Sequence, residues 1–249
     1  MSKSIAVSKQ NQQLHDNVQE AVKEILGATK ALGTVEYAKL LTSTLAAATK
    51  TVTISIADKD FITLKNSGYK LCFAKKVGNN DFNVVWQSYD DYLSTNTFTW
   101  TPQYQLFGTN SFLAGVQVRA QTKAVNVGLG QQVVLGSTGL MGKATTGGPA
   151  TAITLVNEYR PIHPGVSQLS TGINNEQIST PIYVATAPVV TGNISLTPVE
   201  TILVWFEQRV ETSTMFSDSR SMSIEIDMTE ENDASRNYAN GAWTTVKVE

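Results

Sequence analysis

Few side chains of this 249-residue sequence have the types and spacing that enzymatic chemistry requires. His163 lies in the segment RPIHPG, residues 160–165, whose two prolines and glycine predict a loop. A histidine there could act as a general base, but no nucleophile motif accompanies it. A hydrogen bond from this ring to loop backbone is therefore the favoured interpretation. With two histidines and one cysteine in the chain, most zinc sites and disulfide frameworks are excluded.

A glycine-rich segment, QVVLGSTGLMGKATTGG, has a superficial likeness to a phosphate-binding loop. Ser137 stands where that loop needs its first glycine, and Ala144 stands where a hydroxyl would hold magnesium. The segment therefore predicts a glycine-rich loop without a nucleotide. The lone thiol, Cys72, falls in an alternating strand pattern and is expected to be buried rather than reactive.

Acidic side chains cluster near the C-terminus. Their carboxylates could bind calcium, or could supply the acid/base pair of a glycoside hydrolase. Because their spacing matches no calcium loop, a solvated strand and turn is favoured over a metal site. We therefore expect no catalytic residue, no metal and no cofactor. The cluster comprises Asp218, Glu225, Asp227, Glu230, Glu231 and Asp233.

The first candidate contact surface is an apolar stripe near the N-terminus, where residues recur at spacings of three and four and so indicate an amphipathic helix. A core helix packed on a sheet is the favoured interpretation. If it were released, the same stripe could lie in a membrane interface or bind another subunit. The stripe residues proposed for that contact are Leu14, Val18, Val22 and Ile25.

The second candidate contact surface lies within residues 116–135. Val116 and Val118 alternate with polar residues, and after a slip of parity Val125, Val127 and Leu129 do so as well. A membrane β-hairpin requires this alternation. A half-buried sheet strand with a bulge also requires it, and that interpretation is favoured.

The third candidate surface is aromatic. Tyr89, Tyr92, Trp100 and Tyr104 lie among amide and carboxylate residues, the composition of a shelf that binds sugars or lipid headgroups. The same rings could instead pack in the core, and the sequence leaves both alternatives open.

The secondary structure that positions these residues is predicted to change near residue 51. Before it the pattern is helical, and after it many short alternating strands are separated by Gly, Pro and Asn. The sequence therefore predicts a mainly β fold, an antiparallel β-sandwich or barrel-like sheet, preceded by an N-terminal amphipathic helix or helical hairpin. We expect a helical segment over 1–50 and a single β domain over 51–249. The strands expected beyond 51–56 are a hairpin over 69–87, then 97–100, 104–107, 112–124, 152–156, 181–190, 199–210, 222–228 and 243–248.

Charge is sparse and unevenly distributed. Charged residues make up 16% of the chain, and the formal net charge is -2. This balance argues against nucleic acid as a partner, because neutralising phosphates needs a basic surplus. Residues 1–80 hold 11 basic and 6 acidic side chains, whereas residues 200–249 hold 4 basic and 10 acidic. The part of the chain between these two regions is weakly charged and rich in threonine, and a β surface of this composition favours association with a bilayer, a glycan or another copy of the chain.

No secretory signal and no membrane-spanning helix is evident in the sequence. We therefore expect synthesis in the cytoplasm, with release by lysis or by a non-classical route as an alternative. The arrangement of an amphipathic N-terminal helix before a β-sandwich is similar to that of the actinoporin-type cytolysins, a likeness of architecture that no residue motif carries.

Two functions remain after these exclusions. The first is a non-enzymatic, membrane-active β protein that oligomerises on a bilayer, such as a pore-forming toxin with a defensive or insecticidal role. The alternative is a self-assembling structural or glycan-recognition protein, in which the basic N-terminal part of one copy contacts the acidic C-terminal part of the next. Both predict a homo-oligomer, and neither involves a nucleotide.

Overall fold

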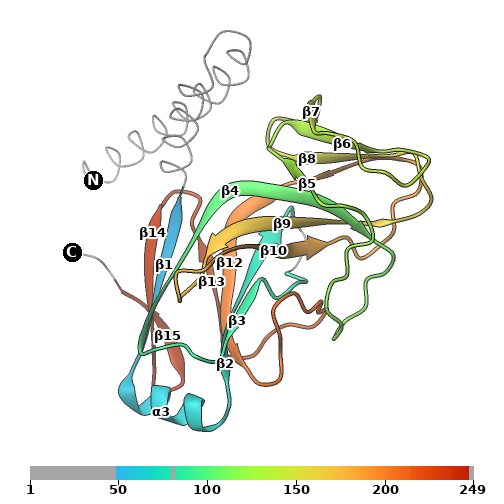
Figure 1. The fold of residues 1–249 in the computed structure, drawn as a ribbon. Coiled ribbons are helices and arrows are strands. Elements are labelled where there is room, and N and C mark those ends of the chain that lie inside the picture. Colours follow the sequence, from blue (N-terminus) through green and yellow to red (C-terminus); the bar gives the residue numbers. More distant parts are fainter. Residues whose placement is uncertain (1–48, 80–81, 247–249) are drawn as a thin grey trace, which may run out of the picture.

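The computed structural model describes residues 49–79 and 82–246, and these residues form a mainly β protein with three sheets and one short helix (Figure 1). The predicted stripe of Leu14, Val18, Val22 and Ile25 lies outside the described residues. The elements are β1 (Lys50–Ile56), α3 (Asp58–Asn66), β2 (Lys70–Val77), β3 (Gln87–Tyr89), β4 (Thr95–Thr109), β5 (Val125–Val127), β6 (Gln131–Leu135), β7 (Thr145–Thr146), β8 (Ile153–Asn157), β9 (His163–Thr171), β10 (Gln177–Val184), β11 (Gly192–Leu196), β12 (Pro198–Glu207), β13 (Ser223–Asp227), β14 (Asp233–Ala239) and β15 (Ala242–Thr245).

The largest sheet has seven strands in the order β10-β9-β4-β1-β14-β15, with β5 added beside β4. Strand β4 is its longest member, and β1 pairs with it in antiparallel register, so that Thr53 lies opposite Thr97. On its other side β1 pairs in parallel with β14, placing Thr53 beside Ser235. This sheet therefore joins the beginning and the end of the described chain.

A second sheet, in the order β13-β12-β2-β3, packs its apolar side chains against those of the first. Phe73 of β2 stacks on Phe98 of β4, with ring centroids 4.4 Å apart, and Trp86 meets Phe98 edge-on at 5.0 Å. Aromatic pairs in these geometries add to the stability that burial of the rings supplies. The main core therefore lies between these two sheets.

The third sheet, in the order β11-β8-β6-β7, forms the upper right part of the molecule in Figure 1. Its strands β6 and β8 are parallel. Val133 of β6 and Leu155 of β8 are buried and belong to the same apolar cluster as the main core. Among the described residues no helix is long and apolar enough to span a membrane.

Several predicted elements differ from the structure. The partner of β2 in the hairpin expected over 69–87 is β3, at Gln87–Tyr89, and the strands expected over 97–100 and 104–107 are one strand, β4. The strand expected over 112–124 is irregular, because Gly115 adopts a φ of 80° and turns the chain away from an extended path. The loop expected around His163 is instead the beginning of β9, which pairs with β4 and β10. Gly165 permits this pairing, because any side chain there would collide with the Phe107 ring that packs against the strand.

Candidate functional site

The four aromatic residues predicted as a ligand shelf are all buried. The rings of Tyr92 and Trp100 are inaccessible to solvent, and Tyr89 and Tyr104 expose only a few per cent of their surface. These rings therefore form no shelf on the surface of the described structure. Burial raises the pKa of Tyr89, and a hydrogen bond from its hydroxyl to Glu176, 2.8 Å long, raises it further.

Trp100 belongs to a polar cluster inside the core. Its indole Nε1 donates to Oε2 of Glu200 at 2.7 Å, and the same oxygen accepts from the Lys75 Nζ at 2.7 Å. Lys75 is fully buried, and its ammonium lies 4.9 Å from the Trp100 ring centroid. Burial raises the pKa of Glu200, but the charge and hydrogen bond of Lys75, the hydrogen bond from Trp100 and the charge of Lys50 together outweigh burial and hold this pKa below its usual range. Burial lowers the pKa of Lys75 despite this partner.

The valines predicted to form one contact face in 116–135 are separated in the structure. Val116 is exposed, whereas Val118 is half-buried and packs against the buried cluster that contains Met215. Val127 of β5 is buried, and Val125 and Leu129 are half-buried against the main core. Only Val116 of this set therefore presents its side chain to solvent.

Residues 112–116 form an exposed loop that we call the apolar tip. Leu113 exposes 59% of its surface and Val116 exposes 41%. Two backbone hydrogen bonds hold the base of the tip. The Gly115 N–H donates to the Met215 carbonyl at 2.8 Å, and the Met215 N–H donates to the Val116 carbonyl at 2.9 Å. Phe112 packs against the buried cluster around Met215 and anchors the tip to the core. Leu113 and Val116 are therefore displayed on a fixed backbone.

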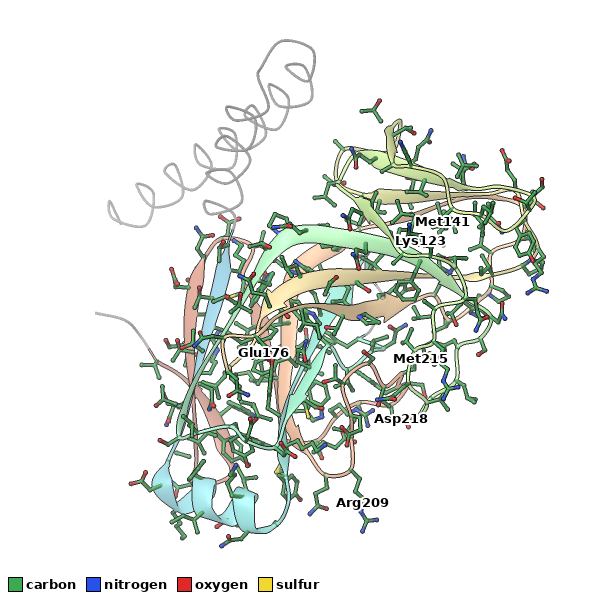
Figure 2. The ribbon with its side chains drawn as sticks, viewed as in Figure 1. Lys123, Met141, Glu176, Arg209, Met215 and Asp218 are labelled. Atoms are coloured by element: carbon green, nitrogen blue, oxygen red, sulfur yellow. The ribbon has the colours of Figure 1, made fainter. Side chains whose placement is uncertain are left out.

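Beside the apolar tip lies a cleft of about 480 Å³ that we call the charged cleft. Ala114, Gly115 and Gln117 supply one wall, and the segment from Glu207 to Arg220 supplies the rest. Figure 2 labels three of its residues, Arg209, Met215 and Asp218, along this segment, with Arg209 at the outer edge of the molecule. The cleft therefore shares residues with the tip.

The charged cleft contains groups of both signs. Arg220 lies 4.3 Å above the Phe216 ring, and its Nη1 donates to Glu207 at 3.2 Å. The Arg220 Nε–H is buried and has no hydrogen-bond partner among the described residues. Arg209 and Asp218 are exposed, and no ion pair involves them in the described part of the chain. The cleft can therefore offer a guanidinium to an anion and a carboxylate to a cation.

Most ion pairs of the described residues join the early and late parts of one chain. Lys70 pairs with Glu211 at 2.6 Å, Lys75 with Glu200 at 2.7 Å, and Lys76 lies 4.0 Å from Glu225. The parallel pairing of β1 with β14 adds backbone contacts between the same regions. Several charges that could attract a second copy are therefore neutralised within the chain.

Two further expectations concern single residues. The Nδ1 of His163 lies 2.8 Å from the carbonyl oxygen of Ala185, which confirms the predicted hydrogen bond to backbone. Cys72 is buried as predicted, and burial raises the pKa of its thiol. Neither group lines the charged cleft.

No family model, no curated protein and no solved structure matches this chain.

The sequence patterns pointed to Val116 and, through the acidic cluster, to Asp218, but not to Leu113 or to the other residues of the charged cleft. A signal for the tip is present, because Phe112-Leu113-Ala114-Gly115-Val116 is an apolar run interrupted by a glycine and placed between polar residues. The cleft has no comparable signal, since its two walls come from segments about a hundred positions apart.

Proposed function

We propose that this protein is non-enzymatic and binds lipid bilayers through the apolar tip and the charged cleft, oligomerising there to permeabilise the membrane. The observation that carries the proposal is the exposure of Leu113 and Val116 beside a cleft with charges of both signs. Exposed aliphatic side chains on a fixed loop can enter the interfacial region of a bilayer, where burial of apolar surface stabilises the bound state.

The cleft favours a zwitterionic headgroup as its ligand. Arg209 and Arg220 can donate to a phosphate, and arginine is well suited to hydrogen-bond phosphate oxygens. Asp218 is exposed, forms no ion pair among the described residues, and can attract the quaternary ammonium of choline. A phosphatidylcholine headgroup carries both charges and therefore matches this arrangement better than a purely anionic lipid does.

For the fold, the proposal is a β-sandwich preceded by a helical segment; the expected antiparallel pairing holds for most strands, but β1 with β14 and β6 with β8 are parallel. The Phe73–Phe98 stack between β2 and β4, and the buried side chains on the facing strands, support the sandwich. In this proposal the predicted helix over residues 1–50 contacts the bilayer or a neighbouring subunit after the tip has bound.

The alternative of head-to-tail assembly in solution receives less support. It required basic groups of the early chain to remain available for the acidic end of another copy. Lys70 and Lys75 instead pair with carboxylates of their own chain, and Lys76 lies near another. Assembly on a membrane does not depend on those groups.

Vesicles of phosphatidylcholine, with and without cholesterol, test the proposal by co-sedimentation and by release of an entrapped dye. The full-length protein is expected to bind and to release dye, with crosslinking on the vesicles showing oligomers. Leu113→Asp is expected to weaken binding by about tenfold, because the variant forfeits burial of an aliphatic side chain worth about 1.5 kcal/mol.

Leu140→Asp is the matched control, since Leu140 exposes 73% of its surface but lies between β6 and β7, outside the charged cleft. Both substitutions replace an exposed leucine, so both variants are expected to fold, as thermal unfolding will show. The proposal fails if the unmodified protein leaves every vesicle composition intact and unbound. It also fails if the two variants lose binding equally.

A further inference from the structure

A second cleft, which we call the hydroxyl cleft, lies beside the turn that joins β9 to β10 and has a volume of about 360 Å³. Thr95, Thr97 and Thr99 of β4 and Thr171 of β9 line it, together with asparagine side chains. Among the described residues that line it, none is charged. The site is therefore chemically unlike the charged cleft.

The threonine hydroxyls of this cleft are free to bind a ligand. Thr95, Thr97 and Thr99 occupy alternate positions of β4 and point to the side opposite the buried Phe98 and Trp100. In the described part of the chain, neither these three hydroxyls nor that of Thr171 forms a hydrogen bond. Each can therefore both donate to and accept from a ligand.

The row of hydroxyls continues onto the neighbouring strand. Antiparallel pairing places Thr51 opposite Thr99, Thr53 opposite Thr97, and Ser55 opposite Thr95. Side chains directly opposite each other on one face lie about 5 Å apart. The cleft consequently opens onto a surface with regularly spaced hydroxyls, and such a surface suits a ligand with repeated hydroxyl groups.

The wall formed by the turn is held in place by its own hydrogen bonds. Asn174 donates from its side chain to Asp91 at 2.8 Å and from its backbone N–H to Glu176 at 3.1 Å. Glu176 in turn accepts from the Tyr89 hydroxyl at 2.8 Å. Asn175 adopts a φ of 61°, a conformation that asparagine tolerates better than most residues. A pre-formed wall lowers the ordering cost of binding.

We propose that the hydroxyl cleft binds a neutral glycan. Hydroxyl and amide groups pair with sugar hydroxyls, and Leu93 and Ile173 can contact the apolar faces of a sugar ring. Because no cation lines the cleft, phosphate, sulfate and carboxylate ligands lack the partner they require. This site is independent of the proposed lipid contact, since the two clefts share no lining residue.

An array of neutral, sialylated and sulfated oligosaccharides, probed with the full-length protein, tests the inference. Binding is expected on neutral glycans. The double variant Thr97→Val with Thr171→Val keeps the β-branched shape but removes two hydroxyls, and its affinity is expected to fall about tenfold. The matched control is Thr146→Val on β7, an exposed strand threonine outside both clefts, which is expected to leave the affinity unchanged.

Absence of neutral-glycan binding, or binding confined to charged glycans, overturns the inference. An equal loss in the double variant and the Thr146→Val control also overturns it. Phosphatidylcholine vesicles carry no glycan, so vesicle binding reports on the apolar tip and the charged cleft and not on the hydroxyl cleft. Leu113→Asp is expected to retain full glycan binding, which separates failure of this inference from failure of the proposed membrane function.

Discussion

The two clefts differ in where the protein places its charge. In the charged cleft Arg209 and Asp218 face solvent, while Arg220 and Glu207 are partly buried and pair with each other. The outer face of β4 at the hydroxyl cleft carries threonines, and its inner face carries Trp100, whose indole donates to Glu200. Behind the neutral cleft, charge is therefore present but buried.

Because of this difference, the charged groups that could bind a ligand are distinct from those that stabilise the fold. Exposed charges such as Arg209 and Asp218 are solvated and contribute little to folding, so these two side chains can be altered without unfolding the protein. A buried ion pair has the opposite property, because loss of one partner leaves the other charge desolvated. The charged cleft is thus suited to experiments on binding, and the core behind the hydroxyl cleft to experiments on stability.

The largest effect is expected for Lys75→Met. This substitution leaves the Glu200 carboxylate without its fully buried partner and is expected to lower the free energy of unfolding by about 3 kcal/mol. Urea denaturation measures the loss. Adding Glu200→Gln is expected to restore part of it, since a neutral amide removes the unpaired charge and keeps an acceptor for the Trp100 indole. A double variant less stable than Lys75→Met would contradict this account of the pair.

The mainly β fold was predictable because alternation carries a strong signal. Val52, Ile54 and Ile56 alternate with polar residues in the sequence and are buried in β1. The helix α3 was missed because it has nine residues and only one of them, Leu64, is buried. Strand β14 was missed because Ser235, Arg236 and Asn237 interrupt any apolar pattern. Its place depends on pairing with β1, about 180 positions away in the sequence.

The candidate sites were less predictable than the fold. Alternation in 116–123 suggested a strand, but Gly115 and the hydrogen bonds to residues 213–215 fix an irregular path. Tyr89 and Trp100 were predicted to line a ligand shelf, but both are buried, and their polar atoms instead hydrogen-bond Glu176 and Glu200. Both clefts are formed by segments distant in the sequence, and such contacts leave no local pattern.

A smaller effect is expected for Arg209→Gln, which tests whether the charged cleft binds phosphate. Loss of one exposed arginine–phosphate contact costs up to about 1 kcal/mol, so affinity for phosphatidylcholine vesicles is expected to fall up to about fivefold. Glycan binding is expected to remain unchanged. The control is Arg119→Gln, an exposed arginine outside the cleft. An equal loss of vesicle binding in both variants would show that general charge, and not the cleft, attracts the membrane.

The smallest effect is expected for Lys70→Gln, the surface counterpart of Lys75→Met. Lys70 pairs with Glu211 at 2.6 Å, but the Glu211 side chain is 62% exposed, so water replaces the lost partner. The free energy of unfolding is therefore expected to fall by less than about 1 kcal/mol in urea denaturation. Because the two lysines lie on the same strand and have equally short contacts, burial is the main difference between them. If Lys70→Gln lowered the free energy of unfolding as much as Lys75→Met does, the different exposure of the two ion pairs would not explain how much each contributes to stability.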